Sequence, residues 1–164
     1  MQSKKGMAKK KDAKTLSLII TLVVFILLCI PCDYESVGVY HGANLWTRFT
    51  YHFFHAGIIH AALNVWCFLS VVFLYHISKA RMLCAYLAAS SIPVCLLNST
   101  PTVGLSGMVF FLFASISFEV QRKVYYQSWM AAYLIIGFLM PATSAWVHLY
   151  CYACGLFLAL INRK

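Results

Sequence analysis

The sequence predicts an all-α membrane protein, a bundle of six transmembrane helices with the N-terminus and the C-terminus cytoplasmic. Two features of composition predict this class: 62% of the 164 residues are hydrophobic, and only 10% are charged. A soluble domain carries about 25% charged residues, so this chain cannot hide its apolar surface in a water-soluble core. The third feature is that the basic residues flank apolar runs, which is typical of membrane topology and not of a nucleic-acid-binding surface.

The elements follow one another as a basic tail and six apolar runs. Residues 1–14 contain six lysines and no apolar periodicity, so we expect a disordered cytoplasmic tail that can touch anionic headgroups. The expected spans cover residues 15–32, 57–75, 82–97, 104–118, 124–140 and 143–161. They form one membrane domain over residues 15–161, and a basic end, 162–164, follows it. The first run is predicted to be an uncleaved span, because no small-x-small site follows it.

The connections between the runs predict the orientation. Residues 33–54 form a long polar-aromatic segment, expected to lie as a loop at the membrane interface, and residues 76–81, 98–103, 119–123 and 141–142 are short links. With the N-terminus inside, the inner segments hold six, two, two and two of the 13 basic residues, which leaves only Arg48 outside. This asymmetry indicates that both termini are cytoplasmic.

Five polar residues from three runs share one depth in this topology. His55, His60 and Asn64 begin the second run, Ser106 begins the fourth, and His148 lies near the start of the last. At 1.5 Å per residue, all lie within about 15 Å of the outer surface. His60 and Asn64 are four residues apart and share a helix face, whereas His55, roughly 140° around, is expected to face the loop. Each could simply bond a neighbouring helix, but polar residues inside a membrane often mark a functional site.

The stretch from Gly104 to Gly107 places Ser106 between two glycines, at the point where a loop enters an apolar run. Such a stretch is commonly a small-residue packing face, and it also lets neighbouring backbone crowd a serine hydroxyl. A serine hydrolase needs a nucleophile, a base and donors for the oxyanion, which Ser106, His148 and the pair His60 and Asn64 can supply. The four acidic residues all fall in loops or the tail, so the catalytic unit would be a Ser–His dyad.

The sequence resembles the rhomboid intramembrane serine proteases over about residues 15–161. The resemblance rests on Gly-x-Ser-Gly at 104–107, on His55, His60 and Asn64 at fixed spacing, and on His148 followed by Gly155 seven residues on. It implies a six-span rhomboid-like bundle with Ser106 as the nucleophile and His148 as the general base. It also implies that His60, Asn64 and the Ser106 backbone N–H stabilise the oxyanion. Supporting roles fall to His55, Gly104, Gly107, Phe110 and Gly155.

Three positions depart from the family's pattern. The arginine that often follows the loop tryptophan is displaced, because Thr47 stands between Trp46 and Arg48. Cys151 replaces a glycine three residues after the histidine, although Cys151 and Gly155 still form a small-xxx-small face. Phe110 replaces a tyrosine four residues after the serine, so it can stack on His148 but cannot hydrogen-bond. None of these changes removes a catalytic group.

The resemblance implies hydrolysis of single-span transmembrane proteins near the outer membrane face. The sequence does not identify the membrane, for which a plasma membrane or bacterial inner membrane is expected, and we expect no cofactor or metal. A second hypothesis is a proteolytically inactive rhomboid-like protein that binds transmembrane clients. A third is a metal- or haem-binding membrane protein, whose candidate ligands are His52, His55, His60, His76 and His148. Metal content after purification separates the third hypothesis from the others, and a fluorophosphonate probe, which labels activated serines, separates the first two. The Cys29/Cys32 and Cys151/Cys154 pairs are expected to be small packing residues, with a Cys29–Cys32 disulfide left open.

Overall fold

The structure, a computed structural model, describes residues 2–75, 77–140 and 143–163, with the backbone alone for residues 2–11. Its helical elements are α1 (Gln2–Leu28), α2 (Tyr34–Val37), α3 (Thr47–Thr50), η1 (Tyr51–Phe53), α4 (Ile58–Leu74), α5 (Lys79–Ser90), η2 (Val94–Leu96), α6 (Ser106–Ser115), α7 (Lys123–Leu139) and α8 (Ala145–Ile161). The described residues form no strand, and an isolated bridge joins Val39 to Thr102. The all-helical fold is the class that the sequence predicts.

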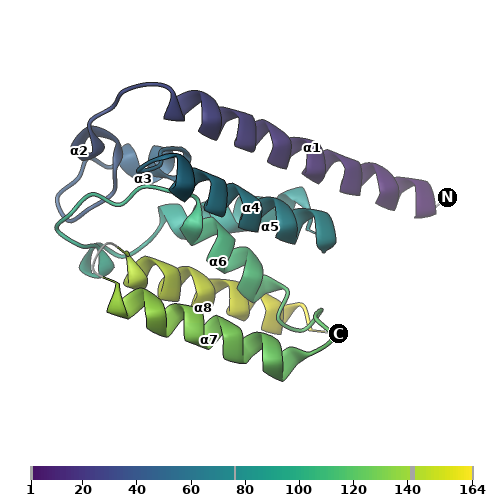
Figure 1. The fold of residues 1–164 in the computed structure, drawn as a ribbon. Helices are drawn as coiled ribbons and strands as arrows, with labels where there is room; N and C mark the ends of the chain where they lie inside the picture. Colours follow the sequence, from purple (N-terminus) through teal and green to yellow (C-terminus); the bar gives the residue numbers. More distant parts are fainter. Residues whose placement is uncertain (1, 76, 141–142, 164) are drawn as a thin grey trace.

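The long helices run side by side along one direction (Figure 1). They pack in the order α1, α4, α6, α8, α7, with α5 against α6. Both chain ends lie at one end of the bundle, called here the terminal end. The loop end, opposite, holds α2, α3 and the first turn of α6. This antiparallel alternation brings the starts of α4, α6 and α8 to the loop end, so residues from three separate helices can meet there.

The six apolar runs correspond to six helices, whose limits differ most at the end of α5 and at the start of α1. α5 ends at Ser90 and not at residue 97, because Pro93 disfavours helical backbone in the residue before it and the chain turns into η2. α1 extends back to Gln2, so residues 2–14 continue the helix where the sequence analysis expected a disordered tail. Lysine, alanine and methionine favour helix, and no proline interrupts this segment. The predicted turn at Pro141 and Ala142 lies outside the described residues.

Within the described part of the chain, no helix taken alone is both long enough and apolar enough to span a membrane. Thr47–Phe53 and Ile58–Leu74, which meet at a 93° bend, are together long enough and apolar enough to span a membrane. Ser106–Ser115 and Ala145–Ile161 are shorter apolar helices. The number of spans and the cytoplasmic orientation of the termini therefore stay predictions.

The helices α6 and α8 approach each other closely at Gly155. A Cβ atom on Gly155 would lie 2.2 Å from the carbonyl oxygen of Phe111 and 2.9 Å from the Cβ of Ala114. At the second residue of α6, a Cβ on Gly107 would lie 3.3 Å from the Cβ of Ala89 and the Sγ of Cys151. Gly155 is needed because no side-chain carbon fits between it and the α6 backbone, whereas Gly107 keeps a tight contact with neighbouring side chains.

Replacing Gly155 with alanine should destabilise the bundle, because the added methyl group meets backbone that cannot move aside. Overpacking of this kind typically costs about 1–3 kcal/mol, and the contact with the Phe111 carbonyl places Gly155→Ala at the upper part of that range. The measurement is thermal unfolding of the purified protein in detergent. Ala153→Val on the exposed face of α8 is the control. Equal unfolding temperatures for Gly155→Ala and wild type would refute the close contact.

Candidate active site

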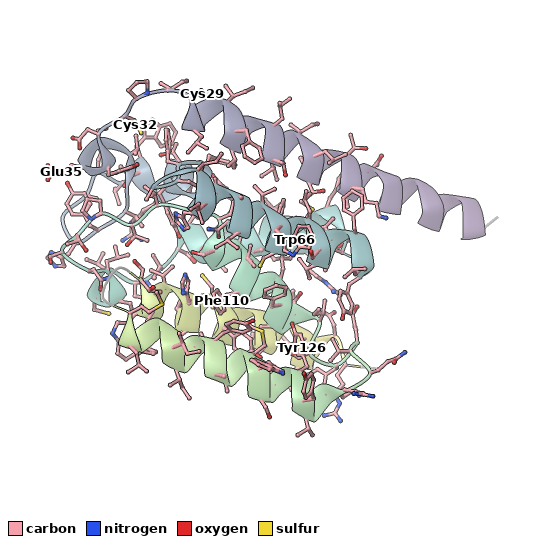
Figure 2. All side chains as sticks on the ribbon, viewed as in Figure 1. Cys29, Cys32, Glu35, Trp66, Phe110 and Tyr126 are labelled. Atoms are coloured by element: carbon pink, nitrogen blue, oxygen red, sulfur yellow. The ribbon has the colours of Figure 1, made fainter. Side chains whose placement is uncertain are left out.

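Ser106 and His148 form a hydrogen-bonded pair at the loop end of the bundle. Ser106 is the first residue of α6 and His148 the fourth residue of α8, and Ser106 Oγ lies 2.8 Å from His148 Nε2. The ring of Phe110 stacks on that of His148, with centroids 4.4 Å apart and 17° between the planes. Phe110 is one turn beyond Ser106 on α6, and Figure 2 shows it in the interior of the bundle. One helix therefore presents the hydroxyl and also holds the imidazole plane.

The loop before Ser106 takes a backbone conformation that requires glycine. Gly104 has φ of 125°, in the region that side chains rarely adopt, and a Cβ there would lie 3.0 Å from Cε1 of His60. The N–H of Gly104 donates to the carbonyl of Tyr51 at 3.0 Å, and the N–H of Leu105 donates to Nε2 of His55 at 3.3 Å. These two bonds fix the backbone that delivers Ser106 to His148.

The structure places His60 and Asn64 on α4 beside this loop. His60 lies against Gly104, and its Nδ1 accepts the N–H of Ala56 at 3.4 Å. Asn64 is buried, and its Nδ2 donates to the His60 carbonyl at 2.9 Å. One of the two N–H donors of Asn64 is thus used within the helix, and an amide carries two.

His55 lies just before α4 and contacts two neighbouring segments. The helix α4 begins at Ile58, so His55 lies before it and helical phase does not set its direction. Its ring lies 5.1 Å from that of His60, and its Nε2 accepts the N–H of Leu105. His55 also lines a small pocket together with Tyr34 and Phe54. The side chain therefore lies between the Gly104 loop and the segment 33–54, which it was expected to face.

The segment Arg48 to His52 is bonded to the end of α5, which sequence reasoning did not identify. Arg48 Nη1 donates to the Ile92 carbonyl at 2.6 Å, and the Tyr51 hydroxyl donates to the Ala89 carbonyl at 3.0 Å. His52 Nε2 lies 3.0 Å from Ser90 Oγ. The last carbonyls of a helix lack intrahelical partners, so Tyr51 caps α5, while Arg48 and His52 bond groups at and just beyond its end. The sequence feature that could have indicated these contacts is the group of Arg48, Tyr51 and His52 close after Trp46.

Arg48, one residue later than the family's pattern, thus fastens the loop. Ala89 also lies against Gly107, so the same end of α5 contacts both the loop and the first turn of α6. Tyr51 contributes to both sides of this arrangement, since its side chain bonds α5 and its carbonyl accepts from Gly104.

The carboxylates make contacts other than with Ser106 and His148. Asp12 pairs with Lys79 and Glu119 with Arg81, at 3.4 and 2.8 Å, where Lys79 and Arg81 begin α5 at the terminal end. Asp33 caps α2 and Glu35 lies within it at the loop end (Figure 2). In the described residues no carboxylate bonds or pairs with His148.

In the described part of the chain, no three His, Cys, Asp or Glu side chains lie close enough together to bind a metal ion. His76, one candidate ligand, lies outside the described residues. The seven cysteines are free thiols. Cys29 and Cys32 lie at the loop end of α1 (Figure 2), and Cys151 is buried between α6 and α8.

Comparison with known proteins identifies the family. The model of the Rhomboid domain matches residues 42–164, three quarters of the chain and all of the residues discussed above as a site. No curated protein matches the chain. The chain therefore belongs to the rhomboid family. The hydrogen-bonded Ser106 and His148 lie within the matched rhomboid domain. Membership in this family supports the classification of the chain as a membrane protein.

Replacing Tyr51 with phenylalanine should loosen the loop, because the Ala89 carbonyl loses its donor in a buried place. An unsatisfied buried acceptor costs about 1–3 kcal/mol, and Tyr51→Phe is expected to lower the thermal unfolding temperature accordingly. Tyr133→Phe removes a hydroxyl from an exposed tyrosine on α7 and is the matched control. Equal effects of the two variants would show that the bond to Ala89 contributes nothing.

Proposed function

We propose that this protein is an intramembrane serine protease that hydrolyses peptide bonds of single-span transmembrane proteins near the outer membrane face. The observation that carries the proposal is the hydrogen bond of 2.8 Å between Ser106 Oγ and His148 Nε2. A hydroxyl within hydrogen-bond reach of an imidazole is the arrangement that an activated serine nucleophile needs. The outer face corresponds to the loop end, because the predicted topology puts both termini in the cytoplasm.

The proposed reaction uses Ser106 and His148 as a dyad. His148 Nε2 takes the hydroxyl proton while Ser106 Oγ attacks the carbonyl carbon of the scissile bond. Breakage of the C–N bond leaves an acyl-serine, and His148 returns the proton to the departing amine. A water molecule that gives its proton to His148 then releases the acyl group and restores Ser106. The Phe110 ring stacked on His148 orients the imidazole in place of an acidic residue.

The oxyanion would be stabilised from two sides of the serine. Ser106 opens α6, so the N–H groups of this first turn have no intrahelical partner, and the positive end of the helix dipole favours a negative charge there. His60, beside Gly104, and the second N–H of Asn64 are the proposed side-chain donors. Preorganised donors of this kind are each worth about 10²–10³ in rate.

A fluorophosphonate probe should label the wild-type protein in detergent and should leave Ser106→Ala unlabelled. Ser106→Ala should also abolish cleavage of a model transmembrane substrate while the fold persists, since only one hydroxyl is lost. Ser128→Ala, at an exposed serine on α7, is the control and should be labelled like the wild type. An unlabelled wild type would favour the alternative function, a proteolytically inactive rhomboid-like protein that binds transmembrane clients. Wild-type cleavage by Ser106→Ala would exclude Ser106 as the nucleophile.

Substitutions of the base and of a donor should differ in severity. His148→Asn should lower the cleavage rate by at least about 10³-fold, because proton transfer is removed. Asn64→Ala should be milder, at about 10- to 1000-fold, because His60 and the α6 backbone still donate. His41→Asn, at an exposed loop histidine, should leave the rate unchanged. A greater loss for Asn64→Ala than for His148→Asn would remove His148 from the role of base.

A further inference from the structure

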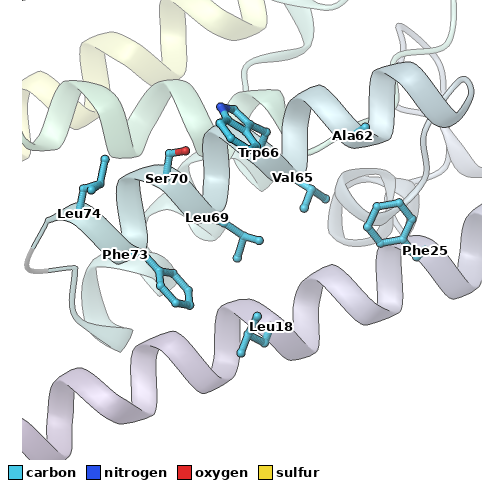
Figure 3. Close-up of a pocket in the computed structure, with 9 residues that line it drawn as sticks. All are labelled: Leu18, Phe25, Ala62, Val65, Trp66, Leu69, Ser70, Phe73 and Leu74. Atoms are coloured by element: carbon cyan, nitrogen blue, oxygen red, sulfur yellow. The ribbon is translucent and has the colours of Figure 1, made fainter.

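A groove separates α1 from α4 along the side of the bundle that lies away from α7 and α8. Figure 3 shows Leu18 and Phe25 of α1 facing Val65, Leu69 and Phe73 of α4 across it. Its volume is about 600 Å³, and its lining is apolar apart from Ser70. A volume of this size is within the range of small-molecule sites, about 300–1,000 Å³.

The groove has a positive charge at its terminal end. Lys14 lies one turn before Leu18 on the same face of α1, and its Nζ lies 4.6 Å from the ring centroid of Phe73, a wall residue. Asp12, the acidic residue nearest in sequence, pairs with Lys79 at 3.4 Å and so does not neutralise Lys14. An apolar channel that ends at an ammonium group matches a ligand with an apolar chain and an anionic head.

The length of the groove matches one leaflet of a bilayer. Lys14 and Phe25 are eleven residues apart on α1, which corresponds to about 16 Å along the helix axis. Half of the hydrocarbon thickness of a bilayer is about 15 Å. A chain that starts at Lys14 and ends at Phe25 therefore reaches from the headgroup level to the middle of the membrane.

We infer that the groove between α1 and α4 binds one acyl chain of an anionic phospholipid, with its phosphate held by Lys14. The lipid belongs to the leaflet at the terminal end, which is the cytoplasmic leaflet in the predicted topology. The chain packs against Leu18, Leu69 and Phe73, and it fills space that the protein's own side chains leave open. This lipid site does not depend on hydrolysis at Ser106, which lies at the opposite end of the bundle.

The experiment measures lipids retained by the full chain in detergent, by native mass spectrometry, after mixing with phosphatidylglycerol and phosphatidylcholine of identical acyl chains. The wild type should retain one phosphatidylglycerol in preference to phosphatidylcholine. Lys14→Ala should reduce this preference about fivefold, because one basic side chain contributes about 1 kcal/mol toward an anionic lipid. Lys123→Ala removes a lysine at the same end from α7, away from the groove, and should leave the preference unchanged.

Two variants that fill the groove test the place of the chain. Leu69→Trp and Ala62→Phe add bulk to the wall and should reduce retention of both lipids, with helicity checked by circular dichroism. Retention unchanged in both folded variants would overturn the site. Equal preference of wild type and Lys14→Ala would overturn the role of Lys14. A dimer that dissociates in the groove-filling variants, in place of a bound lipid, would assign the groove to a second copy of the chain and overturn the inference.

Discussion

The close approach of α6 and α8 is the constraint on which the site depends. Ser106 and His148 are 42 residues apart, and no local structure connects them. Their hydroxyl and imidazole meet because α6 and α8 run in the same direction and touch backbone to side chain at Gly155 and Gly107. A side chain at Gly155 would separate the helices at the Phe111 carbonyl, five residues from the serine. Packing therefore sets the distance that the chemistry requires.

The second constraint acts on the serine through α5. Three side chains of the segment from Arg48 to His52 bond the end of this helix and the residues just after it: Tyr51 bonds the Ala89 carbonyl, Arg48 the Ile92 carbonyl and His52 the Ser90 hydroxyl. The Tyr51 carbonyl also accepts the N–H of Gly104, and Nε2 of His55 accepts the N–H of Leu105. The unusual backbone of Gly104 is thus held by bonds from both sides. A residue with φ of 125° persists because its surroundings leave it no alternative.

The sequence predicts the helices well because long apolar runs have few other structures open to them. It predicts the pairing of Ser106 with His148 from their shared depth and from the resemblance, since apolar periodicity alone carries no distance between the fourth and sixth runs. The end of α5 was misplaced because one residue, Pro93, outweighs a continuous apolar run. The bonds of Arg48 and Tyr51 at and just beyond the end of α5 could not be predicted, because they pair side chains with backbone carbonyls about 40 residues away. The hydrophobic pattern of a sequence does not indicate bonds of this kind.

The shortness of α6 has a consequence for the proposed hydrolysis. With 10 residues, α6 spans about 15 Å, half of the hydrocarbon thickness of a bilayer. Its first residue lies at the loop end, and the irregular segment 97–105 precedes it. Irregular backbone inside a membrane is tolerated where protein or water surrounds it. A serine at the top of a short helix can thus meet water from the loop end while apolar side chains such as Phe110 cover the base from below. The proposed hydrolysis in a membrane needs both conditions, and the place of Ser106 at the start of α6 supports that proposal.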